Sequence, residues 1–278
     1  MQKDGAMDVG VVAQRGNVRA AELADRLRRN LEASVSLDET TAESLDRQGT
    51  APADLDACDL LVSIGGDGTF LFAAREVTPT PVMGVNLGEV GFLNAVSPGD
   101  AVEAVRRVAE RFRRGDLDCT ELPQVAATGE GWSLPPAVNE VAVLGPQRGR
   151  GNGVGVEIRV DGELYAGGHA DGTLVSTPTG STAYNLSEGG ALVHPDVDAL
   201  VVTEMCADES MPSLAVDCDA TVTVRAEATG GEGGYVVCDG RTCQSLGLPT
   251  RVRVERAGEP VRIAGPPLDF FAALGKLA

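Results

Sequence analysis

Residues 60–69 bring together the residue types that phosphoryl-transfer chemistry needs. Residues 60–64 are apolar and predict a buried strand, residues 65–68 read Gly-Gly-Asp-Gly, and Thr69 opens a helical pattern. Glycines allow close approach of the backbone to a ligand and positive φ angles, and free N–H groups at a helix start favour an anion. Asp67 is unusual, because a carboxylate beside a phosphate is repulsive unless it holds a metal or accepts a proton. The stretch therefore indicates phosphoryl transfer, with a tight turn carrying a solvated aspartate as the alternative.

A second stretch, residues 171–185, is dense in side-chain hydroxyl groups. Hydroxyls both donate and accept, so a row of them can bind sugar hydroxyls and base edges. Tyr184 offers a ring on which adenine could stack, Gly180 lets the backbone approach a ligand, and Asp171 could accept from an amide or a ribose. The alternative interpretation is a polar loop at a domain junction.

The first part of the chain alternates strands with helices. We expect strands at residues 8–13, 34–37, 60–64 and 81–86, and helices at 18–31, 41–47, from Thr69 onward and at 100–113. Such alternation predicts a parallel sheet covered by helices. Ligands of these sheets bind at the carboxyl ends of the strands, which is where residues 65–69 lie.

The second part of the chain reads as an all-β domain. Strands are expected at residues 154–160, 199–203, 221–224, 235–237, 251–254 and 261–263, and a helix at 268–277. The glycine-rich residues 149–155 are interpreted as a mobile loop rather than a nucleotide site. We therefore predict an α/β domain at residues 1–118, a β-rich domain at 119–266, and a C-terminal helix at 267–278 that packs back on the first domain.

Composition excludes several classes of protein. The chain has 41 acidic and 23 basic residues, a net charge of −18, and only Lys3 and Lys276 as lysines. This balance is typical of a salt-rich cytoplasm, where ions screen self-repulsion, with an ordinary acidic protein as the alternative. It argues against nucleic acid as the ligand. No apolar run reaches the roughly 18 residues of a membrane span, and the N-terminus lacks a signal-peptide core, so we expect a cytoplasmic protein. The cysteines form no C-x-x-C pair, so we assign no metal-binding side chains.

Several separated stretches resemble one family of kinases. Residues 65–69 resemble the Gly-Gly-Asp-Gly-Thr signature shared by NAD kinases, diacylglycerol and sphingosine kinases and 6-phosphofructokinases, which leaves the acceptor open. Further stretches resemble NAD kinase motifs in the order of that family, namely residues 86–93, 138–141, 171–184, 189–195 and 238–241. Because the lipid kinases lack the long Thr/Ser run at 171–184, the chain as a whole resembles the NAD kinase family.

This resemblance implies an α/β N-terminal domain with a parallel sheet, an all-β C-terminal domain, and NAD bound between them. It implies that Asp67 is catalytic and orients or deprotonates the adenosine 2′-hydroxyl. The implied NAD-binding residues are Asp67, Gly68, Phe92, Asn139, Glu140, Asp171, Thr179, Thr182, Ala183, Tyr184 and Asn185. The residues implied to face the donor phosphates are Gly65, Gly66, Gly68 and Thr69.

The implied activity is phosphorylation of NAD to NADP by ATP or polyphosphate, with Mg²⁺ or another divalent cation neutralising charge. We expect a homodimer or homotetramer. One departure concerns residues 204–212, where the family usually has a proline-containing loop with a basic residue; here the loop is acidic and has no Arg, Lys or His. The alternatives are a non-catalytic NAD(P)-binding paralogue and a kinase of a lipid or sugar acceptor on the same scaffold.

Overall fold

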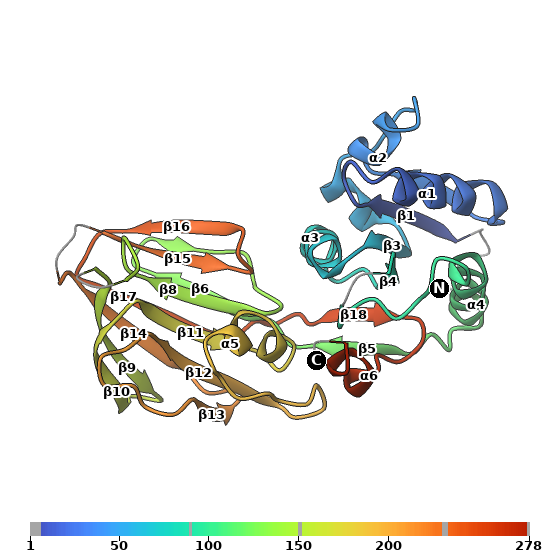
Figure 1. Ribbon diagram of the computed structural model, residues 1–278. Helices are drawn as coiled ribbons and strands as arrows, with labels where there is room; N and C mark the ends of the chain where they lie inside the picture. The colour runs from blue at the N-terminus through green and yellow to red at the C-terminus, as the bar shows by residue number, and fades with distance from the viewer. Residues whose placement is uncertain (1–6, 89–90, 150–151, 230–232, 277–278) are drawn as a thin grey trace. The chain divides into compact units, whose positions relative to one another are not determined.

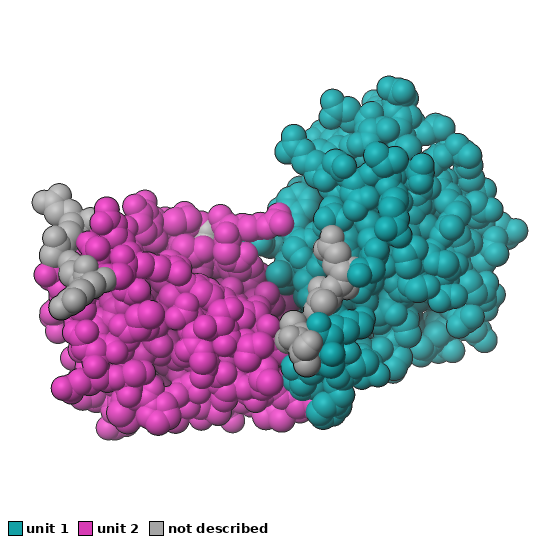
Figure 2. All heavy atoms as spheres, viewed as in Figure 1, with its two compact units in different colours: residues 1–122, 259–278 teal, residues 123–258 magenta. Residues whose placement is uncertain are grey.

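The structure is a computed structural model that describes residues 7–88, 91–149, 152–229 and 233–276 (Figure 1). The chain forms two compact units (Figure 2). Unit 1 comprises residues 1–122 and 259–278, and unit 2 comprises residues 123–258. Within the described ranges, no helix is long and apolar enough to cross a membrane.

Unit 1 is built on a six-stranded sheet. Its strands are β1 (Asp8–Ala13), β2 (Ser34–Leu37), β3 (Leu60–Gly65), β4 (Val82–Asn86), β5 (Cys119–Leu122) and β18 (Val261–Ala264). They are ordered β2-β1-β3-β4-β18-β5, and neighbouring strands are parallel except for β18 and β5. The predicted parallel sheet is confirmed, and an antiparallel strand is added at one edge.

Capping residues set where the first two helices of unit 1 begin. The helices of this unit are α1 (Val18–Asn30), α2 (Glu39–Glu43), a 3₁₀ helix η1 (Pro52–Ala57), α3 (Asp67–Val77), α4 (Ala101–Arg114) and α6 (Phe270–Leu274). Asn17 caps α1 by accepting the N–H groups of Arg19 and Ala20, as its position predicts. The helix expected at 41–47 begins earlier, because Asp38 accepts the N–H groups of Thr40 and Thr41.

The core of unit 1 joins α1 and α4 to one face of the sheet. Leu27 of α1, Ile64 of β3 and Val105 of α4 are fully buried in the same apolar cluster. Burial of each such side chain is worth about 1.5–3 kcal/mol relative to exposure. This packing fixes the end of β3, where residues 65–69 begin.

Unit 2 is built on antiparallel sheets, which confirms the β-rich prediction, and adds the short helices η2 (Gly180–Thr182) and α5 (Tyr184–Ser187). One sheet has the order β10-β9-β14-β17-β6-β7 and the other β13-β12-β11-β8-β15-β16. Their strands are β6 (Val125–Gly129), β7 (Trp132–Ser133), β8 (Glu140–Leu144), β9 (Val154–Val160), β10 (Glu163–Ala170), β11 (Gly172–Ser176), β12 (Ala199–Met205), β13 (Leu214–Asp217), β14 (Val222–Glu227), β15 (Gly234–Cys238), β16 (Thr242–Leu246) and β17 (Thr250–Arg256). Val143, Ile158 and Val202 are fully buried in one cluster that draws on both sheets.

Two strands lie in a different unit from the one suggested by their place in the sequence. β5 and β18, which the sequence groups with the β-rich part, pair with each other, and β18 also pairs with β4 of unit 1. A short apolar strand pattern predicts a strand but not its partner, because sheet pairing depends on tertiary contacts. The domain boundaries predicted after residues 118 and 266 remain a prediction.

Candidate functional site

The glycine-rich turn of unit 1 is tighter than expected. Gly65 is the last residue of β3, Gly66 caps α3 with a φ of −96°, and Asp67 is the first residue of the helix. The helix therefore begins two residues before the expected Thr69, and the expectation of positive φ at this turn is wrong for Gly66. Gly65 is required for a different reason, since a Cβ there would lie 2.6 Å from the Thr69 Oγ1 atom. Close packing of the strand end on the helix selects this glycine.

Three donors from one loop hold the carboxylate of Asp67. Its Oδ2 accepts the N–H of Phe92 at 2.8 Å, and its Oδ1 accepts the N–H of Leu93 at 3.1 Å and the Asn94 Nδ2 at 2.8 Å. A Cβ on Gly91 would lie 2.7 Å from the Oδ1 atom, so only glycine fits beside the carboxylate. The sequence suggests that the charge of Asp67 needs a metal or a proton, whereas the structure balances it with hydrogen bonds from residues 92–94.

Phe92 has an aromatic partner that the sequence does not reveal. Its ring centroid lies 6.0 Å from that of Phe270 in α6, with the planes tilted by 51°. Helix α6 therefore contacts the loop that holds Asp67. Phe92 is only partly buried, so part of its surface is open to a ligand.

In unit 2, Asp239 holds the segment that carries the predicted residues Asn139 and Glu140. Its carboxylate accepts the N–H of Val138 at 2.9 Å, of Asn139 at 2.8 Å and of Glu140 at 3.3 Å. Asp239 has a φ of 48°, a left-handed conformation that aspartate adopts more readily than most residues. The sequence singles out residues 238–241 as a turn but does not predict this anchoring role.

Glu140 is a buried carboxyl group with an unusual pKa. Its residue is 6% exposed, and its Oε2 atom has no hydrogen-bond partner among the described residues. Burial first, and the charge of Asp239 second, raise its pKa from 4.5 to about 8, against the opposing effect of the Tyr184 backbone N–H. The group is therefore neutral near pH 7 and can donate as well as accept a hydrogen bond.

Three hydroxyls of the predicted ligand-binding run bond to backbone carbonyls within the protein. Thr177 Oγ1 donates to the Val138 carbonyl at 2.6 Å, and Ser181 Oγ donates to the Pro178 carbonyl at 2.6 Å. Thr182 Oγ1 donates to the carbonyl of Thr179 at 3.0 Å. These hydroxyls fold the loop, so any contact of this loop with a ligand depends on its remaining backbone and side-chain atoms.

Gly180 and Asn185 also serve packing. A Cβ on Gly180 would lie 2.0 Å from the Asn139 carbonyl oxygen, so this glycine permits close contact with residue 139. Asn185 is fully buried. Its Nδ2 donates to the Ser181 carbonyl at 3.3 Å and the Ala191 carbonyl at 2.9 Å, and its Oδ1 accepts the Thr203 hydroxyl at 2.8 Å. The side chain of Asn185 is therefore fully used in joining loop to sheet.

Tyr184 and Asp171 are joined by a loop that the sequence presents only as mobile. The guanidinium carbon of Arg148 lies 5.3 Å from the centroid of the Tyr184 ring, and Asp171 Oδ1 accepts the N–H of Gly149 at 3.0 Å. Gly151 of this loop lies outside the described residues. Arg148 was missed because its short stretch, Gln147-Arg148-Gly149, carries no recognisable motif.

The comparisons with known proteins agree along nearly the whole chain. A model of the ATP-NAD kinase N-terminal domain matches residues 28–113, and a model of the ATP-NAD kinase C-terminal domain matches residues 138–264. The NAD kinase of Natronomonas pharaonis is 63% identical over 271 residues, which cover 98% of this chain and 100% of that protein. The chain belongs to the NAD kinase family. The NAD kinase of Halobacterium salinarum is 56% identical over 281 residues, with the same coverage of 98% and 100%.

Solved structures of this family share the fold. An Archaeoglobus fulgidus NAD kinase in complex with ATP has a TM-score of 0.79 and 26% identity, covering 98% of both chains. Yeast NADH kinase complexed with NADH has a TM-score of 0.83, covering 99% of this chain and 88% of that one; its 21% identity makes this a likeness of fold alone. The α/β and β architecture predicted for an NAD kinase is thereby confirmed.

The acidic loop that departs from the NAD kinase pattern is held by one of its own carboxylates. Glu204 is 6% exposed, and its Oε2 accepts the N–H of Met211 at 2.9 Å. The hydroxyl of Tyr165 donates to the carbonyl of Pro212 at the end of the same loop. Glu204 therefore orders residues 205–212.

The predicted site residues fall into two groups. Gly65, Gly66, Asp67, Gly68, Thr69 and Phe92 lie in unit 1, and Asn139, Glu140, Asp171, Thr179, Thr182, Ala183, Tyr184 and Asn185 lie in unit 2. Among the described residues, no group of three His, Cys, Asp or Glu side chains is placed to hold a metal ion. The oxygens of Asp67 already face three N–H donors.

Proposed function

We propose that this protein phosphorylates the adenosine 2′-hydroxyl of NAD with ATP and so makes NADP. The observation that carries the proposal is the 63% identity to an NAD kinase across 98% of this chain and 100% of that relative. The A. fulgidus NAD kinase in complex with ATP, which shares 26% identity, supports ATP as the donor.

Unit 2 would bind the nucleoside. The neutral carboxyl of Glu140 has an unpartnered buried oxygen, so it can exchange hydrogen bonds with ribose hydroxyls or an adenine edge. Asn139 precedes it and is fixed by Asp239 through its N–H. Tyr184 would stack on the base, with Asp171, Thr179, Thr182 and Ala183 around it. Because Asn185 is already saturated with protein partners, we place it behind the pocket rather than in it.

Unit 1 would act on the reacting groups. A carboxylate has about four lone-pair positions, and three donors already face that of Asp67, which leaves room for one more donor. We propose that the 2′-hydroxyl takes this position, so that Asp67 orients it for attack. Gly65, Gly66, Gly68 and Thr69 would face the donor phosphates, since the positive end of α3 favours anions.

Three finer points are proposals as well. Polyphosphate is a possible second donor, and Mg²⁺ or another divalent cation would enter bound to the donor phosphates rather than to a protein cage. We also propose a homodimer or homotetramer, to be measured by sedimentation at molar KCl, and a cytoplasmic location.

The test is a turnover assay at molar KCl with separate panels of acceptors and donors. NADP formed from NAD and ATP, detected by mass spectrometry, would support the proposal. NAD binding by calorimetry without turnover with any donor would favour the non-catalytic paralogue. Phosphorylation of diacylglycerol, sphingosine or fructose 6-phosphate, with NAD left unchanged, would favour the kinase of another acceptor.

A further inference from the structure

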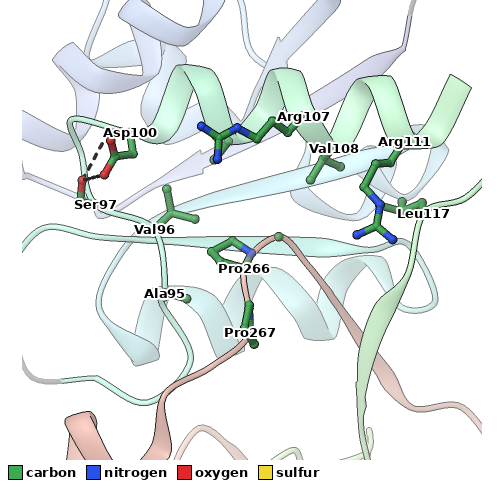
Figure 3. Close-up of a pocket in the computed structure, with 12 residues that line it drawn as sticks. Ala95, Val96, Ser97, Asp100, Arg107, Val108, Arg111, Leu117, Pro266 and Pro267 are labelled. Atoms are coloured by element: carbon green, nitrogen blue, oxygen red, sulfur yellow. Dashed lines mark hydrogen bonds between the residues drawn. The ribbon is translucent and has the colours of Figure 1, made fainter. Parts of the chain in front are cut away.

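Unit 1 contains a cavity that none of the predicted site residues lines. It has a volume of about 640 Å³ and is bounded by α4, residues 95–97 and residues 265–267 (Figure 3). Its apolar walls come from Val96, Val108, Leu117, Pro266 and Pro267. This size and lining suit a small organic molecule.

The charged groups of the cavity leave positive charge available. Asp100 accepts the hydroxyl of Ser97 at 2.7 Å and keeps its negative charge. The Nε of Arg107 donates to the Glu103 carboxylate at 3.3 Å, which leaves its Nη groups for a ligand. Arg107 and Arg111 lie one helical turn apart on α4 and both line the cavity (Figure 3). Arg111 uses its Nε and one Nη to donate to the Asp116 carbonyl, at 3.2 and 2.8 Å. Of the five N–H groups of a guanidinium, the others can face a ligand.

The helix that supplies these arginines is basic in an acidic protein. α4 carries five arginines and two glutamates, whereas the whole chain has a net charge of −18. In molar salt the Debye length is about 3 Å, so only direct contacts select a ligand by charge. Paired guanidinium groups over an apolar wall match a phosphate, sulfonate or carboxylate attached to an apolar body.

We propose that this cavity binds a small organic anion, with its apolar body against Val96, Val108 and Pro266 and its charged head on Arg107 and Arg111. The site has a direct connection to Asp67. Residues 95–97 continue from residues 92–94, which hold the Asp67 carboxylate. Val96 also pairs with β4, accepting the N–H of Asn86 at 2.9 Å. A ligand that shifts residues 95–97 therefore changes turnover; this second step rests on the proposed function.

The test uses two fluorescent probes that share an apolar body. 8-Anilinonaphthalene-1-sulfonate carries the anionic head, and N-phenyl-1-naphthylamine lacks it. We expect the sulfonate to bind at one site per chain in molar KCl, and Arg107→Gln to weaken its binding about tenfold while leaving binding of the neutral probe unchanged. Arg111→Gln should act likewise, with folding checked by circular dichroism because Arg111 also holds the Asp116 carbonyl.

Arg114→Gln is the matched control. Arg107 and Arg114 are both exposed on α4, and each pairs with a glutamate one turn earlier, but only Arg107 lines the cavity. The proposed site is refuted if Arg114→Gln weakens binding of the sulfonate probe as much as Arg107→Gln does. It is also refuted if saturating NAD displaces the probe. If fewer probe molecules bind per chain as the protein concentration rises, the proposal is overturned, because a second copy of the chain then occupies the cavity.

Turnover separates the two steps of the proposal. We expect the sulfonate probe to change kcat of the wild-type protein. For Arg107→Gln, the same change in kcat should need about tenfold more probe. Confirmed binding with unchanged kcat would overturn the connection to Asp67. If the protein makes no NADP at all, the proposed function fails, and the binding experiment still decides whether the anion site exists.

Discussion

The carboxylate of Asp239 accepts the backbone N–H of Glu140 at 3.3 Å and places a negative charge near the buried Glu140 carboxyl. Burial is the largest cause of the rise in the Glu140 pKa from 4.5 to about 8, and the charge of Asp239 is the next largest. The turn that fixes the position of Glu140 thus also helps to keep it neutral. This relationship joins two motifs about 100 residues apart in the sequence.

The first prediction follows from the proton held by Glu140. The folded-state pKa lies above the unfolded value, so between pH 4.5 and about 8 the unfolded chain releases a proton that the folded protein keeps. Stability must therefore fall as pH rises through this window, by an amount on the order of a few kcal/mol. Glu140→Gln removes this dependence, so the variant should lose less stability than the wild type between pH 5 and 8.

The measurement is the free energy of unfolding by urea at several pH values in molar KCl. Glu163→Gln, on exposed strand β10, is the control and should follow the wild type. Equal slopes for the wild type and Glu140→Gln would show that Glu140 does not carry the proton.

The second prediction concerns Asp67. Asp67→Asn replaces one carboxylate oxygen by an amide nitrogen, which cannot accept a hydrogen bond from residues 92–94, and it removes the charged group proposed to orient the 2′-hydroxyl. We expect kcat to fall by roughly 10²-fold or more. Asn94→Ala removes one of the same hydrogen bonds and keeps the carboxylate, so it should retain far more activity. Similar kcat values for the two variants would reduce the role of Asp67 to holding the loop.

Local patterns predicted most elements of the fold. The helical spacing of residues 18–31 and the apolar run at 60–64 correspond to α1 and β3 within a residue, because the first reports burial of one helix face and the second burial of a whole strand. The partners of β5 and β18 could not be predicted in this way. Their pairing joins residues near 120 to residues near 262, and nothing in either segment records the other.

The motifs did not predict how their glycines and hydroxyls pack within the protein. The glycines at 65 and 180 were expected to approach a ligand, but each accommodates a neighbouring part of the protein. The hydroxyls of Thr177 and Ser181 bond to backbone carbonyls, an outcome that residue type alone cannot distinguish from ligand binding. Arg148 reaches Tyr184 only through the path of its loop.

The third prediction tests the response to salt. A chain with net charge −18 repels itself at low ionic strength, and dissolved ions screen this repulsion. We expect the melting temperature to rise steeply from low salt to molar KCl. Sucrose, which adds no ions, is the control that separates screening from general exclusion of solute. A melting temperature that is flat across the KCl series would contradict the interpretation of a surface adapted to salt.

The last prediction concerns the base proposed to stack on Tyr184. The ring packs beside Ala142, Leu174 and Met205, and its hydroxyl lies near the side chains of Arg148 and Glu188. Tyr184→Ala should weaken NAD binding by about 1–3 kcal/mol, the scale of base–aromatic stacking. Tyr184→Phe keeps the ring and loses only the hydroxyl, so its affinity should stay close to that of the wild type. Calorimetry with NAD in molar KCl measures both variants, with folding checked by circular dichroism. If Tyr184→Ala binds NAD as tightly as Tyr184→Phe does, the base does not stack on this ring, and the placement of the nucleoside on unit 2 loses its main support.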